Sequence, residues 1–156
     1  VINALALQDA IERRGVETRV QTALTITRVA EPYILRKALN HLEKGRIVIF
    51  ACGTGNPFFS TDTAVALRAA EINADVILLA KNVDGIYDSD PKVNKNAKKY
   101  DEIKYIDFIS NELKAMDTAA VAICMENKTP VLVFGLNEEN SIVRVCQGEK
   151  LGTWIR

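Results

Sequence analysis

One stretch of the chain concentrates side chains that suit the binding of a small anionic ligand. It reads GTGNPFFSTD over residues 53–62 and lies between an apolar, strand-like run and a helical pattern. Open α/β sheets bind ligands in loops of this kind, at the carboxyl ends of their strands. Thr54 and Asn56 supply hydrogen-bonding groups, and Phe58 and Phe59 supply apolar faces. Thr61 stands at the expected helix start, where exposed amides favour a phosphate. The stretch therefore suits a small nucleotide.

Two common nucleotide motifs do not describe this stretch. The third glycine of a dinucleotide fingerprint is replaced by Phe58, and no Gly-Lys-Ser/Thr follows to complete a Walker A loop. The alternative interpretation is a tight strand-to-helix turn in which Thr61 or Asp62 only caps the helix.

A second stretch follows another apolar strand and reads KNVDGIYDSDP over residues 81–91. Asp84-Gly85 is typical of a turn, and Tyr87 and Asp90 are spaced to flank a base and a ribose. Because Asp-Gly and Asp-Pro are frequent turn formers, a purely structural turn is the alternative here.

Apolar periodicity predicts the elements that position these stretches. Helices are expected at Ile2–Ile11, Pro32–Glu43, Asp62–Asn73, Asp107–Ala115 and Thr118–Asn127, and strands at Thr18–Ile26, Arg46–Cys52, Asp75–Ala80 and Val131–Phe134. Continuous apolar strands that alternate with helices indicate parallel strands covered on both faces. We therefore predict an α/β fold, a three-layer α/β/α sandwich with a mainly parallel sheet, formed by residues 1–156 as a single domain. Residues 83–106 lack helical periodicity and are expected to form a hairpin or flap.

Composition narrows the class of partner. Twenty Lys and Arg balance twenty Asp and Glu, so the chain lacks the overall basic field typical of duplex-binding proteins, and we expect no nucleic-acid partner. No apolar run reaches the ~20 residues of a membrane span, so no membrane partner is expected. Three cysteines without metal-site spacing are interpreted as core thiols of a reducing, cytoplasmic environment, and no metal site is predicted. His41, the one histidine, is expected on the solvated face of its helix.

Taken together, the order and spacing of the two stretches closely resemble the bacterial uridylate kinases (UMP kinases), within the amino acid kinase family. The resemblance continues through KAMDTAA at residues 114–120 and GEKLGT at residues 148–153. It implies transfer of the γ-phosphoryl group of ATP to UMP, which gives UDP in pyrimidine nucleotide biosynthesis, by an enzyme assembled as hexamers. ATP would be the donor, with Mg²⁺ carried by the nucleotide. A catalytic base is not needed, because a phosphate monoester with a second pKa of ~6 is already an anion.

The resemblance also implies roles for individual residues. Asp62 and Asp117 match acidic positions near the reacting phosphates, where they would orient the groups that hold the transferred charge. Tyr87 and Asp90 match ATP-binding positions, and a further ATP-binding residue falls at Lys81 or Asn82, between which the sequence does not choose. The UMP-binding segment comprises Thr54, Gly55, Asn56, Pro57, Phe58, Phe59, Ser60 and Thr61.

One part of the family pattern has no match in this chain. Members begin with a strand and a lysine-containing glycine turn that binds ATP, followed by a glycine-rich loop that binds the UMP phosphate. We therefore interpret the chain as the C-terminal two-thirds of the enzyme and expect it to be inactive by itself, because phosphoryl transfer depends on those charges and amides. Two alternatives are a non-catalytic nucleotide-binding regulatory module of the same fold and another phosphotransferase of the family.

Overall fold

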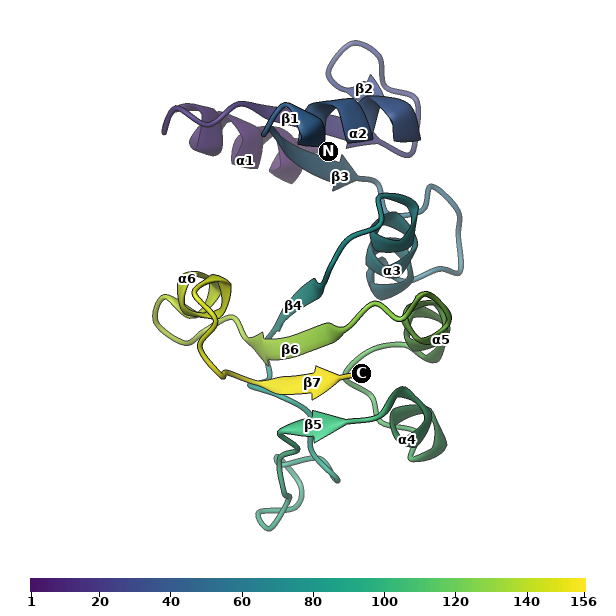
Figure 1. The fold of residues 1–156 in the computed structure, drawn as a ribbon, viewed down its shortest axis with the longest axis vertical. Coiled ribbons are helices and arrows are strands. Elements are labelled where there is room, and N and C mark those ends of the chain that lie inside the picture. Colours follow the sequence, from purple (N-terminus) through teal and green to yellow (C-terminus); the bar gives the residue numbers. More distant parts are fainter. The chain divides into compact units, whose positions relative to one another are not determined.

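Two β-sheets organise the structure, one in each of two parts of the chain (Figure 1). The computed structural model describes residues 1–156, which divide into unit 1, Val1–Ala64, and unit 2, Val65–Arg156. Helices and mainly parallel strands alternate along both units, which confirms the predicted α/β class. The single domain stays a prediction, and each unit is described by itself.

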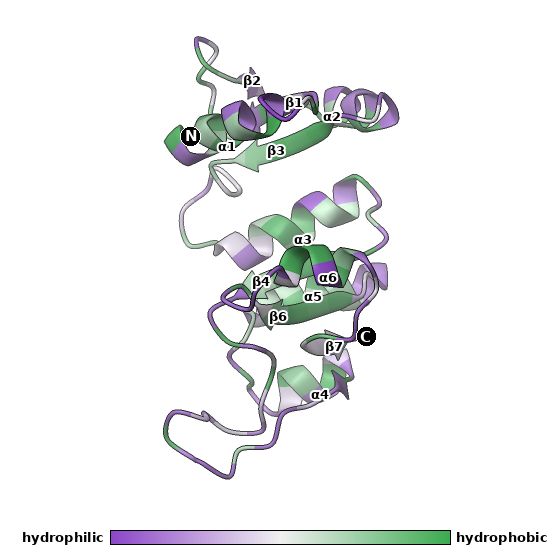
Figure 2. Cartoon of the chain, turned by 90° about the vertical axis from the view of Figure 1, so that its left-hand side faces the viewer, coloured by the Kyte–Doolittle hydropathy of each residue, from purple (hydrophilic) through white to green (hydrophobic).

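Unit 1 contains a three-stranded parallel sheet in the order β2-β1-β3. Its strands are β1 (Thr18–Thr22), β2 (Glu31–Pro32) and β3 (Ile47–Ala51), and β3 is apolar along its length (Figure 2). Helix α1 (Ile2–Glu12) contacts β1 and β3, and α2 (Leu35–Glu43) contacts β3. Because β1 and β3 are parallel and pair Thr22 with Ala51, their carboxyl ends lie at one edge of the sheet.

Unit 2 contains a four-stranded sheet in the order β4-β6-β7-β5. The strands are β4 (Ile77–Lys81), β5 (Glu102–Ile103), β6 (Val131–Gly135) and β7 (Thr153–Ile155). The pairs β4–β6 and β5–β7 are parallel, whereas β6 and β7 are antiparallel. A mainly parallel sheet is therefore present, with one reversal where the short helix α6 (Ser141–Cys146) connects β6 to β7.

The sheet of unit 2 is covered on both faces, as Figure 1 shows with α6 on one side and α4 and α5 on the other. Alternate residues of a strand point to opposite faces. Val131 and Val133 pack in a core that includes α3 (Thr61–Glu71), α4 (Tyr105–Ser110) and α5 (Thr118–Asn127). Leu132 and Phe134 instead pack with Val145 of α6. This arrangement gives the predicted three layers.

Several local predictions were wrong. Pro32 was expected in the first turn of a helix but pairs with Thr22 as part of β2, and α2 begins only at Leu35. The helix expected to reach Ala115 ends at Ser110, since the next residues form a turn in which Glu112 has a φ of 50°. The strand-like sequence before Tyr105 forms β5, whose partner β7 lies about 50 residues later in the chain. The hairpin or flap expected for residues 83–106 stays a prediction, and Tyr87 and Lys99 form an antiparallel bridge within it.

The cysteines also differ from expectation. Only Cys124 is buried, whereas Cys52 is half-buried and Cys146 is exposed, so the prediction of three core thiols was wrong. Burial and, to a smaller extent, the charge of Asp117 raise the pKa of Cys124 to about 11, which keeps that thiol protonated and inert.

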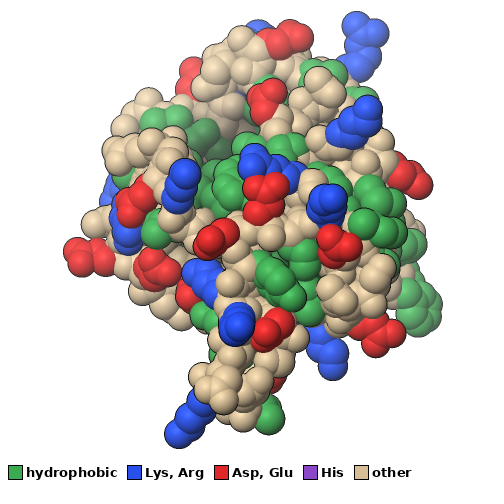
Figure 3. Space-filling view, turned by 60° about the horizontal axis from the view of Figure 1, so that its bottom comes forward, with side chains coloured by type: hydrophobic (Ala, Val, Ile, Leu, Met, Phe, Trp, Pro, Cys, Tyr) green, Lys and Arg blue, Asp and Glu red, His purple; other side chains and the backbone are tan.

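The surface carries charges of both signs, as the equal numbers of acidic and basic residues predict. Acidic, basic and apolar side chains are interspersed on the face drawn in Figure 3. None of the helices has the length and apolar character that a membrane-spanning helix needs.

Candidate functional site

The loop of residues 52–60 lies where the sequence predicts a binding loop, after the last residue of β3. The Ala23 amide donates to the Ala51 carbonyl, so both strand ends meet at the start of the loop. A Cβ atom on Gly55 would lie 3.1 Å from the Ala23 side chain, which shows how closely the loop packs on the end of β1. The loop thus occupies the carboxyl edge of a parallel sheet, the usual ligand position in such folds.

The two phenylalanines of this loop are open to solvent. Phe58 is 103% exposed and Phe59 is 58% exposed, although large apolar side chains are normally buried. Phe58 also has a φ of 71°, a region that side chains larger than glycine rarely adopt. Strained backbone of this kind clusters at ligand-binding segments. The loop therefore exposes one phenylalanine side chain fully and more than half of the other to solvent.

The polar residues of the loop are held by short-range hydrogen bonds. The Asn56 amide donates to Thr54 Oγ1 at 3.2 Å, and Asn56 Nδ2 donates to the Thr54 carbonyl at 3.4 Å. Both bonds form between exposed groups, where water can replace them. Thr54 and Asn56 are thus positioned together, with side chains that a ligand can engage.

The start of α3 is capped by a residue that the sequence analysis did not choose. Ser60 Oγ accepts from the amides of Asp62 and Thr63, both at 3.1 Å, which is the bonding pattern of an N-cap. Neither Thr61 nor Asp62 is that cap. Because Ser60 engages two of the amides expected to meet a phosphate, a ligand here would rely more on loop side chains than on the helix end.

A cavity of about 480 Å³ in unit 2 contains two of the residues predicted to bind ATP, Tyr87 and Asp90. Neither Lys81 nor Asn82 lines it, and Lys81 is the last residue of β4, where its carbonyl accepts from the Leu136 amide at 2.7 Å. The choice between Lys81 and Asn82 stays a prediction. The full lining is Val83, Gly85, Ile86, Tyr87, Asp88, Ser89, Asp90, Pro91, Lys92, Asn111, Glu112, Leu113, Lys114 and Ala115.

Residues 111–115 form one wall of this cavity, and the sequence analysis missed them. The sequence predicts them as part of a helix that reaches Ala115, whereas the helix ends at Ser110 and a turn follows. The available signal was the run of polar residues Asn111 and Glu112 after an apolar turn, which is typical of a helix end.

Asp84 bonds to residues on both sides of the segment of residues 86–100, which carries Tyr87 and Asp90. Its carboxylate accepts from Tyr87 Oη at 2.9 Å and from Lys99 Nζ at 3.0 Å. Burial opposes ionisation, but the hydrogen bonds from Lys99 and Tyr87 prevail and hold the pKa of Asp84 below its ordinary value. The same bond to Asp84 is the main cause that raises the pKa of Tyr87. Tyr87 is therefore oriented as a neutral phenol.

Acid is expected to weaken this connection. Since the pKa of Asp84 is lowered by folding, its carboxylate contributes stability above the unfolded pKa of ~3.9, and that contribution is lost as pH falls through the lower folded value. The free energy of unfolding should therefore differ between wild type and Asp84→Asn by a constant amount above about pH 5 and converge below about pH 4. Denaturant titrations across this range measure it. A difference that persists unchanged into strong acid would contradict the assignment.

Asp117 is the N-cap of α5. Its Oδ1 accepts from the Ala120 amide at 2.8 Å, and the residues from Ala119 to Met125 in the helix that follows are all apolar. Asp62 lies in the first turn of α3, where its negative charge interacts favourably with the positive end of the helix dipole. Both acids therefore have a local structural role, which does not test the catalytic role predicted for them.

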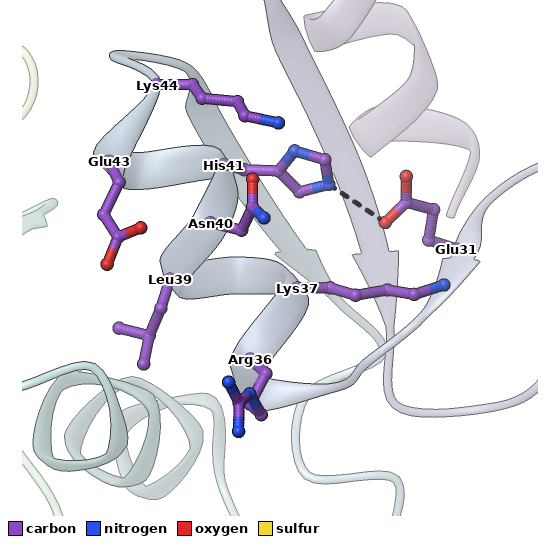
Figure 4. A pocket seen from close by; sticks show the side chains of 8 residues that line it. All are labelled: Glu31, Arg36, Lys37, Leu39, Asn40, His41, Glu43 and Lys44. Carbon is purple, nitrogen blue, oxygen red and sulfur yellow. Dashed lines mark hydrogen bonds and ion pairs between the residues drawn. The ribbon is translucent and has the colours of Figure 1, made fainter.

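A larger cavity, of about 720 Å³, lies in unit 1 and contains none of the predicted site residues (Figure 4). His41 was expected to be solvated, but its side chain is only 14% exposed. Its Nε2 lies 3.1 Å from Glu31 Oε2, and its Nδ1 lies 3.2 Å from Arg46 Nη1. The expectation was wrong because β2, which carries Glu31, was not predicted. The lining is Glu31, Arg36, Lys37, Leu39, Asn40, His41, Glu43 and Lys44.

Comparisons with known proteins show the family of this chain. Residues 1–135 match the sequence model of the amino acid kinase family. The fold is similar to the crystal structure of UMP kinase from Bacillus anthracis, with 42% identity and a TM-score of 0.95 over 99% of this chain and 64% of that one. UMP kinase from Ureaplasma parvum gives 40% identity and a TM-score of 0.93, with coverages of 99% and 66%. Uridylate kinase from Archaeoglobus fulgidus gives 34% identity and a TM-score of 0.65, with coverages of 80% and 59%. The chain therefore spans less than two thirds of the length of each.

Proposed function

Because the chain belongs to the amino acid kinase family, we propose that the protein containing it is a UMP kinase, which transfers the γ-phosphoryl group of ATP to UMP. One observation carries the proposal: the TGNPFFST loop occupies the carboxyl edge of a parallel sheet in a chain 42% identical to a UMP kinase. A phosphate oxygen of UMP would attack the γ-phosphorus as the bond to the bridging oxygen breaks, giving UDP and ADP.

Residues 54–61 would form the acceptor site. The exposed rings of Phe58 and Phe59 suit a pyrimidine base, because base–aromatic stacking needs an open π-face. Thr54 and Asn56 offer exposed hydrogen-bonding groups that now bond only to each other and that a ligand could engage. Ser60, which caps α3, would fix the direction in which the loop enters the helix.

The donor would bind in the cavity of unit 2. Tyr87 and Asp90 line it, and 480 Å³ is within the usual size of nucleotide-sized pockets, ~300–1,000 Å³. Asp90 Oδ1 accepts from the Lys92 amide at 2.8 Å, which holds its turn. Mg²⁺ would arrive with the ATP phosphates.

The remaining assignments rest on the family alone. Asp62 and Asp117 would orient the cationic groups that neutralise the transferring phosphoryl group, whose charge is spread over three oxygens in the transition state. The protein would be a cytoplasmic homo-oligomer, a hexamer, that supplies UDP for pyrimidine nucleotide biosynthesis.

The test is UDP formation from UMP and ATP by the complete protein, with one variant that separates the two sites. Asn56→Ala is expected to raise the KM for UMP about tenfold, the effect of losing roughly one polar contact, and to leave the KM for ATP unchanged. Asn127→Ala is the matched control, because Asn127 is an exposed asparagine that bonds only within α5. An equal rise in both KM values would contradict the assignment of the loop to UMP.

A further inference from the structure

The hydroxyl group of Thr153 joins the two ends of the segment that carries Tyr87 and Asp90. Thr153 lies in β7 and is completely buried. The Ile86 amide donates to Thr153 Oγ1 at 2.9 Å, and Oγ1 donates its proton to the Tyr100 carbonyl at 2.5 Å. One side chain thus bonds to both ends of the segment of residues 86–100, whose end residues, Ile86 and Tyr100, form its neck.

We propose that Thr153 is a positioning residue for the donor nucleotide, which it does not itself contact. It would fix the neck against the sheet and thereby hold Tyr87 and Asp90 in their places in the cavity. This inference rests on the proposed function, because it takes that cavity as the ATP site.

The other hydrogen bonds of residues 86–100 run within the segment or to Asp84, which lies just before it. The Tyr100 amide donates to the Ile86 carbonyl at 2.8 Å, and the Asp88 amide donates to the Lys98 carbonyl at 3.0 Å. These two bonds hold the two sides of the segment to each other but not to the sheet. The side chain of Ile86 is 2% exposed and packs in the core. The hydrogen bonds of Thr153 add directional contacts that fix the backbone of the neck.

The neck approaches Thr153 very closely. A Cβ atom on Gly85 would lie 2.7 Å from Thr153 Oγ1, a distance that real Cβ atoms do not reach, so only a glycine fits there. Thr153 is itself held by its pairing with Val133 of β6. Residues 85–87, which line the cavity, are therefore held directly against β7, an inner strand of the sheet.

Thr153→Val in the complete protein tests the proposal. Valine keeps the shape but leaves the Ile86 amide and the Tyr100 carbonyl buried without partners, a state that favours opening of the neck. We expect hydrogen exchange over residues 86–100 to rise about tenfold, the KM for ATP to rise about tenfold, and the KM for UMP to stay within about twofold. Thr153→Ser, which restores the hydroxyl, should return all three to wild-type values.

A matched control separates positioning from general destabilisation. Val131 is as buried as Thr153 and lies in β6, where it pairs with Ile155. Val131→Ala is expected to lower the melting temperature without changing the ratio of the two KM values. If the valine variant does not fold, Thr153→Ala carries the same expectations.

The outcomes distinguish this proposal from the proposed function. Wild-type protein that forms no UDP would overturn the proposed function, while hydrogen exchange would still test the fastening of the neck. Unchanged exchange over residues 86–100 in Thr153→Val would overturn the role of the hydroxyl. Faster exchange with an unchanged KM for ATP would overturn its role in positioning the donor.

Discussion

Asp117→Asn in the complete protein is expected to lower kcat by about 100-fold or more while leaving the melting temperature within a few degrees of wild type. The structure makes this substitution selective. Asp117 caps α5 through a 2.8 Å bond from the Ala120 amide, and asparagine caps helices about as well as aspartate. The substitution therefore removes the negative charge and keeps the cap. A charge that orients cationic groups against the transferring phosphoryl group acts mainly in the transition state, so kcat and kcat/KM should fall together.

Steady-state kinetics and a thermal melt on the same preparations decide this prediction. Asp107→Asn is the control, because Asp107 lies in the first turn of α4 and is not assigned to either nucleotide site. It should leave kcat unchanged. Normal turnover with a lowered melting temperature in Asp117→Asn would show that Asp117 is a helix cap only.

Gly152→Ala is expected to destabilise the protein by about 3 kcal/mol or more. Gly152 has a φ of 77°, and a Cβ atom there would lie 2.0 Å from the Val133 carbonyl oxygen and 2.9 Å from the Phe134 Cα atom. The obstructing atoms belong to the backbone of β6, the central strand beside β7, so they cannot move without breaking the sheet. We expect the substitution to disturb the pairing of β7 with β6 and the hydrogen bonds of the Thr153 hydroxyl, the next residue in the chain.

Denaturant unfolding of Gly152→Ala and Gly148→Ala measures this effect. Gly148 has a φ of 86°, but nothing lies within 4 Å of its missing Cβ atom. Its substitution therefore reports only the cost of the left-handed backbone, about 1 kcal/mol. Equal losses in the two variants would refute the steric explanation and leave backbone strain as the whole effect.

Local sequence patterns predicted the elements whose stability is itself local. The helix expected at Thr118–Asn127 has those bounds in the structure, because Asp117 caps one end, apolar residues fill its middle, and Lys128 ends it in the left-handed conformation. The strands β3, β4 and β6 differ from the predicted runs by at most two residues, since a continuous apolar run needs cover on both faces wherever it lies. The position of the loop that carries Thr54 to Thr61 was also predictable, because chain order places it after β3. Its role in binding stays a prediction.

Predictions failed where a partner distant in sequence decides the outcome. Glu31 and Pro32 form a strand only because β1 offers Gln21 and Thr22 as pairing partners. That strand in turn brings Glu31 to His41 and converts an expected surface histidine into a half-buried, paired one. Two-residue strands carry too little periodicity to be seen in a sequence.

The sequence by itself determined the α/β class, the order of the main elements, the family resemblance and the loop that carries Thr54 to Thr61, because each depends on short-range pattern or on residue identity. Only the tertiary structure decided that residues 111–115 line the cavity with Tyr87 and Asp90, and that Thr153 joins Ile86 to Tyr100 across 67 and 53 residues of chain. The physical reason is that hydrogen bonds and packing between such distant residues depend on how strands pair, and strand pairing is a property of the whole sheet, which no local pattern encodes.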